Sequence, residues 1–173
     1  MTADDRRTLA ADISRASRLT GTFTLRSGQV SDQYFDKYRF EAEPALLARV
    51  AAAMLPLVPA DADVLAGLEL GGVPIATAMS LQSGKRAAFV RKEAKTYGTC
   101  LAVEGGDVSG KKVAMIEDVI STGGAVVDAA ALLRQAGAEI VAVVCAIWRG
   151  AGEPAIPGLD CPVLPAFRMA ELP

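Results

Sequence analysis

Short apolar runs alternate with helical segments between residues 64 and 148, and this alternation restricts the fold more than any other feature. Continuous apolar strands separated by helices are typical of a parallel sheet that is covered on both faces. We therefore predict an α/β fold whose ligands bind beyond the carboxyl ends of the strands. The apolar runs are Val64–Leu70, Ala87–Val90, Lys112–Ile116 and Ile140–Trp148, and the helical patterns between them are Ile75–Leu81 and Ala125–Ala136.

The remaining segments carry shorter and more polar patterns. With 173 residues in all, the chain is expected to form one domain, 1–173. The elements expected outside the alternating region are an amphipathic helix over 4–18, a hairpin of β-type runs at 23–25 and 34–38 around Ser27-Gly28, a helix from Pro44 to about Leu55, and one edge strand within Cys161–Pro173.

The composition excludes several classes of function. The chain contains no His, which removes Ser-His-Asp and Cys-His nucleophile systems and His-ligated zinc. A formal net charge of −2 argues against a non-specific nucleic-acid binder, and no apolar run is long enough to span a bilayer. Cys100, Cys145 and Cys161 are odd in number and match no zinc or redox spacing, so we expect reduced thiols in a cytoplasmic protein.

Two glycine-rich segments imitate nucleotide-binding motifs. The run 105–111 resembles a Walker A loop, but Lys112 follows it instead of Ser or Thr, and the run precedes a strand where a P-loop must follow one. The run 150–155 imitates a dinucleotide fingerprint, but Pro154 and Pro157 exclude the helix that would hold a pyrophosphate. A Rossmann oxidoreductase is therefore disfavoured.

The segment Val113–Ala125 carries the chemistry. An apolar strand leads directly into Glu117 and Asp118, and a Ser-Thr-Gly-Gly turn then opens a helix. Hydroxyls and backbone N–H groups at a helix N-terminus bind anions, and two adjacent carboxylates suit sugar hydroxyls or hydrated Mg²⁺. We expect Asp118 to face solvent and ligand. The alternative is that Ser121 only caps the helix and that the acids are solvated turn residues, which leaves two acids next to an apolar strand unexplained.

This segment resembles the phosphoribosyl diphosphate (PRPP) motif of the type I phosphoribosyltransferases, in which four apolar residues, two acids and two apolar residues precede a Ser/Thr-Gly turn. The resemblance implies that Glu117 and Asp118 contact the ribose and that the following turn holds the 5′-phosphate. The PRPP-binding residues that it implies here are Val119, Ile120, Ser121, Thr122, Gly123, Gly124 and Ala125.

A second segment places Arg91, Lys92 and Lys95 within five residues after an apolar run. A solvated basic loop is the ordinary explanation for such a charge run. The sequence also resembles the mobile lid of orotate phosphoribosyltransferases, which usually reads Arg-Lys-Glu-Ala-Lys-x-His-Gly, with Tyr97 here in place of His. The resemblance implies that these cations and Tyr97 contact PRPP or pyrophosphate. It also implies a homodimer in which the lid acts on the neighbouring subunit.

Three further matches complete the resemblance. The N-terminal hairpin resembles the base-binding hairpin of the family, the loop after the first apolar run resembles its pyrophosphate loop, and the residue after Trp148 matches an arginine that meets the carboxylate of orotate. The implied orotate-binding residues are Arg26, Ser27, Gly28, Phe35, Ser121 and Arg149, and the implied pyrophosphate-loop residues are Leu70, Gly71 and Gly72.

Together these matches imply the type I phosphoribosyltransferase fold with a hairpin hood over about 1–40, a PRPP-binding core over about 60–150 and a lid over about 92–110. The implied reaction joins PRPP and orotate into orotidine 5′-phosphate and pyrophosphate, with Lys92, Lys95, Glu117 and Asp118 as catalytic residues. Mg²⁺ would be held mainly by PRPP, with at most a water-mediated contact to Asp118. A phosphoribosyltransferase for another base and a PRPP-sensing regulator are the alternatives.

Overall fold

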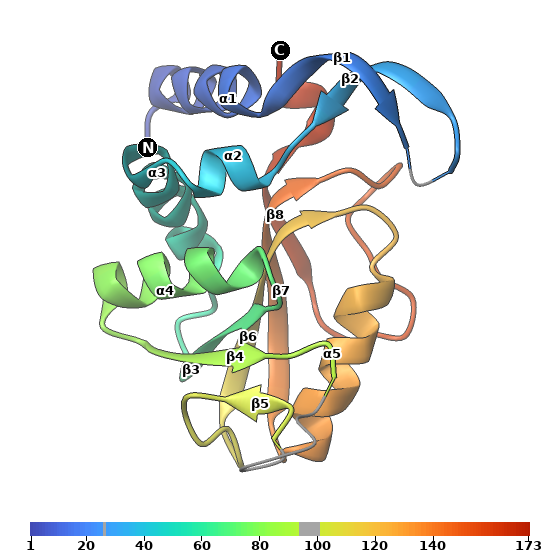
Figure 1. Ribbon diagram of the computed structural model, residues 1–173. Coiled ribbons are helices and arrows are strands. Elements are labelled where there is room, and N and C mark those ends of the chain that lie inside the picture. The colour runs from blue at the N-terminus through green and yellow to red at the C-terminus, as the bar shows by residue number, and fades with distance from the viewer. Residues whose placement is uncertain (26, 94–100) are drawn as a thin grey trace.

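The predicted apolar runs form strands of one six-stranded sheet in a computed structural model that describes residues 1–25, 27–93 and 101–173 (Figure 1). The strand order is β5-β4-β3-β6-β7-β8, and only β5 runs antiparallel to its neighbour. The predicted parallel sheet is therefore confirmed. Its strands are β3 (Val64–Leu68), β4 (Arg86–Val90), β5 (Val103–Glu104), β6 (Lys112–Ile120), β7 (Glu139–Trp148) and the edge strand β8 (Val163–Arg168).

Helices cover both faces of this sheet, as the apolar strands predict. One hydrophobic cluster joins Ile13, Val50 and Met79 to Ile116 of β6, and a second joins Leu133 to Met115 on the opposite face. Figure 1 shows α1, α3 and α4 on one side and α5 on the other. The helices are α1 (Ala3–Ser17), α2 (Tyr38–Glu41), α3 (Pro44–Met54), α4 (Gly72–Ser83) and α5 (Gly124–Gln135), with 3-10 turns η1 (Leu55–Leu57) and η2 (Met169–Glu171). Within the described residues, no helix combines the length and the apolar character needed to cross a membrane.

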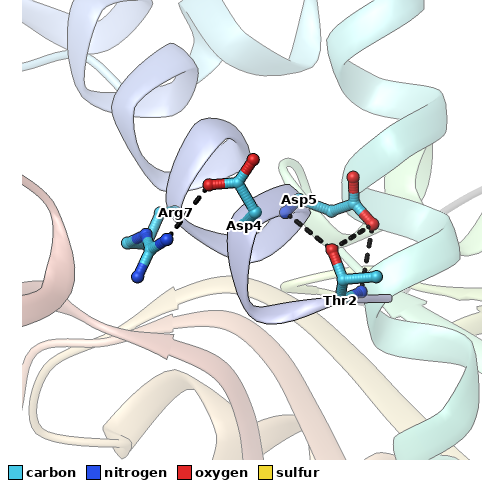
Figure 2. A network of polar contacts seen from close by, with 4 residues as sticks. All are labelled: Thr2, Asp4, Asp5 and Arg7. Atoms are coloured by element: carbon cyan, nitrogen blue, oxygen red, sulfur yellow. Dashed lines mark hydrogen bonds and ion pairs between the residues drawn. The ribbon is translucent and has the colours of Figure 1, made fainter.

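The first helix begins where its polar residues cap it (Figure 2). The Asp5 N–H donates to Thr2 Oγ1 at 3.1 Å, and the Thr2 N–H donates to Asp5 Oδ2 at 3.0 Å. This reciprocal capping box satisfies backbone donors that the first helical turn leaves free. Asp4, whose Oδ1 lies 3.0 Å from Arg7 Nη2, adds a second negative charge near the N-terminal end of the helix dipole.

The N-terminal hairpin forms as expected from β1 (Arg18–Thr24) and β2 (Val30–Phe35), which pair antiparallel outside the main sheet. The predicted second run was too long, because β2 ends at Phe35 and a one-turn helix, α2, follows. Asp36 ends the strand: its carboxylate accepts the Tyr38 N–H at 3.2 Å, and its carbonyl accepts the Arg39 N–H at 3.3 Å. Such a local turn competes with strand pairing.

Strand β6 extends beyond the expected end at Ile116. It stays paired with β7 through Glu117, Val119 and Ile120, because β7 continues beside it as far as Trp148. The two acids consequently lie inside a paired strand and not after it. Neither of the two glycine-rich segments, 105–111 and 150–155, begins a helix, which agrees with the prediction that they do not bind nucleotides.

Candidate active site

The two acids lie at the carboxyl end of β6, in the centre of the sheet between β3 and β7. Glu117 is 8% exposed and Asp118 is 0% exposed. The expectation that Asp118 faces solvent is therefore wrong. The turn between β3 and α4 covers it: a Cβ atom on Gly71 would lie 1.7 Å from Asp118 Oδ2. Only glycine allows the backbone to approach the carboxylate so closely.

Asp118 is neutralised by a residue that the sequence reasoning missed. Lys37, at the start of α2, places its Nζ 2.6 Å from Asp118 Oδ2. Glu41 at the other end of α2 is also buried, and its Oε1 would lie 2.9 Å from the same Gly71 Cβ position. Lys37 follows the hairpin residues that carried the resemblance, but no motif marked it or Glu41.

Four ionisable groups thus lie close together in a largely buried volume: Lys37, Glu41, Glu117 and Asp118. Their pKa values move in different directions. Burial raises the pKa of Glu117 to about 9, and the adjacent Asp118 adds to the rise. Burial and Asp118 likewise raise the pKa of Glu41 to about 9. Burial opposes ionisation of Asp118 as well, but its contacts with Glu117 and Lys37 outweigh this and hold its pKa below the usual value. At neutral pH the cluster therefore holds one carboxylate, one ammonium and two neutral acids.

The turn after β6 leads into α5 without a side-chain cap. Gly123 is the N-cap residue with a φ of +80°, a left-handed conformation that favours glycine. The alternative role of Ser121 as the helix cap is therefore wrong. Ser121 and Thr122 are exposed, and they lie between the acids and the N-terminal end of α5. Free N–H groups and the helix dipole make such an end an anion site.

The loop that resembles a pyrophosphate loop lies beside the first lid residues. The Glu69 side chain accepts the Lys92 backbone N–H at 2.9 Å, and the Glu69 N–H donates to the Val90 carbonyl at 2.9 Å. The Glu69–Leu70 peptide bond is cis. A cavity of about 190 Å³ is lined by Glu69, Arg91, Lys92 and Glu117 among others. Lys95 and Tyr97 lie outside the described residues, so their predicted contacts stay predictions.

A second cavity, of about 540 Å³, lies between the hairpin and the carboxyl ends of β6 and β7. It brings together three residues predicted to bind the base: Phe35, Ser121 and Arg149. The Arg149 backbone N–H donates to the Ile120 carbonyl at 2.7 Å, which fixes the point where its side chain leaves the sheet. Lys37 also lines this cavity.

The structure does not place the described residues at the tip of the hairpin against the larger cavity. Ser27 and Gly28 form the turn between β1 and β2, and neither is among the described residues that line the larger cavity. Arg26 lies outside the described residues. The predicted roles of these three residues in binding the base stay predictions.

Taken together, one end of the sheet offers an anion turn, a buried acid pair, a cationic edge at Arg91 and Lys92, and a cavity with an arginine for an acidic planar ligand. Together these groups can bind a phosphorylated sugar that carries a diphosphate leaving group, with an acceptor molecule beside it.

Known proteins resemble this chain in sequence and in fold. The phosphoribosyl transferase domain family matches residues 39–163. The orotate phosphoribosyltransferase of Nocardioides sp. is 58% identical over 166 residues, covering 95% of this chain and 93% of the relative. A crystal structure of Mycobacterium tuberculosis orotate phosphoribosyltransferase with Fe(III) dicitrate has a TM-score of 0.86 at 32% identity, covering 97% and 98% of the two chains. The same enzyme in complex with PRPP has a TM-score of 0.81 at 31% identity, with the same coverage.

Proposed function

The chain belongs to the phosphoribosyltransferase family, and within it to the orotate phosphoribosyltransferases, and we propose that it transfers the 5-phosphoribosyl group of PRPP to orotate, giving orotidine 5′-phosphate and pyrophosphate. This is a step of pyrimidine nucleotide synthesis. One observation carries the choice of acceptor: Arg149 lines a cavity that adjoins Ser121 of the phosphate turn. A planar guanidinium matches the carboxylate of orotate.

The proposed role of each residue follows from its position in the site. The turn Ser121–Gly124 and the start of α5 bind the 5′-phosphate. Glu117, neutral at its raised pKa, exchanges hydrogen bonds with a ribose hydroxyl, and the negative charge of Asp118 lies beneath the developing oxocarbenium ion. Arg91 and Lys92, with Lys95, neutralise the leaving pyrophosphate. No protein nucleophile is needed, because the acceptor nitrogen attacks the ribose directly while positioning and charge lower the barrier.

Mg²⁺ is part of the proposal. Within the described ranges, no group of three or more Cys, Asp or Glu could hold a metal ion. Hard oxygen ligands suit Mg²⁺, which usually keeps several waters and binds substrate phosphates. The diphosphate of PRPP and water would therefore supply its ligands, and the ion would offset diphosphate charge when bound.

We also propose a homodimer in which the segment that begins at Lys92 acts on the partner's site. The expected lid over 92–110 was too long, because Val103–Glu104 pairs with β4 as strand β5 and Val108 is buried in the subunit's own core. Arg91 and Lys92 follow directly from β4, at the same end of the sheet as the acids.

Mixing two inactive variants, Lys95→Ala and Asp118→Asn, should restore activity if each heterodimer contains one intact site. Heterodimers that form and stay inactive would show that the segment acts within its own subunit.

The free thiols of Cys145 and Cys161 support a cytoplasmic location.

The deciding experiment is the loss of orotate absorbance in the presence of PRPP and Mg²⁺. We expect turnover of orotate, and we expect Arg149→Gln to raise the KM for orotate much more than the KM for PRPP, because Arg149 lines the cavity proposed for the acceptor. Turnover of adenine, guanine or hypoxanthine without turnover of orotate would assign the chain to another base. PRPP binding without turnover of any base would favour a PRPP-sensing regulator.

A further inference from the structure

Lys37 lines one cavity of the site and also contacts the buried Asp118. Its Nζ lies 2.6 Å from Asp118 Oδ2, which is closed to solvent, while its side chain is 32% exposed and lines the cavity of about 540 Å³. The same Nζ lies 5.2 Å from the centre of the Tyr38 ring, a favourable position for a cation above an aromatic face. Lys37 therefore lines the acceptor cavity and holds a buried acid of the site with the same side chain.

Three segments of the chain meet at one carboxylate oxygen. Asp118 comes from β6, Lys37 from the start of α2, and Gly71 from the loop between β3 and α4. The second oxygen of Asp118 accepts the backbone N–H of Val119, so both oxygens are held. Phe40, which is fully buried, anchors α2 to the core and keeps Lys37 in place. The position of Asp118 is thus set by contacts from outside its own strand.

We propose that Lys37 is a positioning residue: its ion pair holds the Asp118 carboxylate against the 69–72 loop and thereby aligns the PRPP site with the acceptor cavity. This rests on the proposed function. Lys37 does not touch the reacting atoms, and its effect passes through Asp118.

Charge makes the arrangement dependent on Lys37. Asp118, Glu117 and Glu41 are three acidic groups in a nearly dry volume, and Lys37 is the cation paired with Asp118. A buried carboxylate that loses its counter-ion must become neutral, move towards water or draw water in. Movement of the carboxylate or entry of water would displace the 69–72 loop, because Gly71 leaves no space beside Asp118 Oδ2. Neutralisation would instead remove the charge that the site has fixed. Small displacements of binding groups can cost about 100-fold in rate.

The test is a double-variant cycle on kinetics and on calorimetric PRPP affinity. Lys37→Met should lower kcat/KM for PRPP by about 100-fold and weaken PRPP binding, and Lys37→Arg, which keeps the charge, should recover most of both. The Asp118→Asn background is expected to be inactive, so affinity alone is compared there, and Lys37→Met should have little further effect on it. Lys112→Met is the matched control: Lys112 pairs with Asp61 at 2.7 Å at the other end of β6 and should leave kinetics unchanged.

Several outcomes would overturn the proposal. An equal loss of PRPP affinity from Lys37→Met in both backgrounds would mean that Lys37 does not act through Asp118. A rise confined to the KM for orotate would make Lys37 an acceptor contact. A lower melting temperature with unchanged kinetics would make its role structural. If Lys37→Met does not fold, the cycle is run with Lys37→Gln and Lys37→Arg, and wild-type kinetics in both would equally overturn the proposal.

Calorimetric binding of PRPP keeps this test separate from the proposed function. If wild type turns over orotate but Lys37 variants bind PRPP and turn over normally, the inference fails and the function stands. If wild type binds PRPP but does not use orotate, the function fails. PRPP binding weakened by Lys37→Met, but not by Lys112→Met, would then still support Lys37 as the positioning residue.

Discussion

Strand β6 has a lysine–aspartate ion pair at each of its ends, and the two pairs differ far more in surroundings than in length. At the amino end, Lys112 Nζ lies 2.7 Å from Asp61 Oδ2, with side chains that are 42% and 59% exposed. At the carboxyl end, Lys37 Nζ lies 2.6 Å from Asp118 Oδ2, with side chains that are 32% and 0% exposed. Water screens the first pair and is excluded from the aspartate of the second.

The comparison shows that burial, and not distance, decides how much an ion pair matters. The exposed pair can lose a partner to solvent with little consequence. In the buried pair, loss of one partner leaves an uncompensated group among other acids. The buried pair lies at the end of the sheet that holds the site, where charge that is fixed before the substrate arrives lowers the barrier.

The largest contrast is expected from removing the aspartate charge at each end. Asp118→Asn leaves Lys37 without its buried partner and should cost about 3 kcal/mol of unfolding free energy, or about 6–12 °C in melting temperature for a chain of this size. Turnover should fall as well, because the charge under the ribose is lost. Asp61→Asn should leave melting temperature and turnover nearly unchanged. Calorimetry and initial rates check both, and similar shifts for the two variants would contradict the comparison.

A smaller contrast is expected from adding one methyl group beside Asp118 and one at a bend beside β4. Gly71 has an ordinary φ of −69°, so Gly71→Ala fails only through the Cβ clash with Asp118 Oδ2 at 1.7 Å. Overpacking of this kind costs about 1–3 kcal/mol, and we expect a higher KM for PRPP because the 69–72 loop must move. Gly106→Ala is the control, since its Cβ would meet only the Ala87 carbonyl at 3.7 Å. Wild-type kinetics in Gly71→Ala would show that the loop adapts freely.

The same contrast separates what the sequence could predict from what it could not. The apolar run 112–116 predicted the first part of β6, and the acids after Ile116 and the Ser-Thr-Gly-Gly turn marked the functional end. These signals are local. The burial of Asp118 is not local, because it depends on Gly71 and on Lys37, which are far away in the chain. Periodicity cannot show which loop covers a carboxylate.

Local competition explains the other differences. The run 34–38 has residues that suit a strand, but Asp36 bonds to its own neighbours and starts α2. The end of β6 was placed too early because charged residues usually end a buried strand, whereas pairing with β7 carries this one to Ile120. Lys37 and Glu41, the two residues missed at the site, both lie at the ends of this unpredicted helix.

The remaining contrast is in the pH dependence of stability, and Glu41→Gln measures it. Three charged or ionisable neighbours face Glu41: Asp118 from β6, and Lys37 and Asp36 next to α2. Burial and Asp118 raise its pKa from 4.5 to about 9, so folding favours the protonated acid. That contribution is fully present below pH 4.5 and is lost as the pH rises towards 9, at no more than about 1.4 kcal/mol per pH unit for one proton.

Glutamine resembles the protonated acid in size and can donate a hydrogen bond, but it cannot ionise. We therefore expect Glu41→Gln to match wild type near pH 5 and to become progressively more stable than wild type up to pH 8, as measured by melting temperature at each pH. Asp61→Asn provides the opposite sign, because Lys112 lowers the pKa of Asp61 and the contribution of this pair is lost only as the pH falls through that lowered pKa. Its difference from wild type should stay constant between pH 5 and 8. A constant difference for Glu41→Gln as well would mean that Glu41 is already ionised in the folded chain, and that the buried end of β6 carries more negative charge than Lys37 alone can balance.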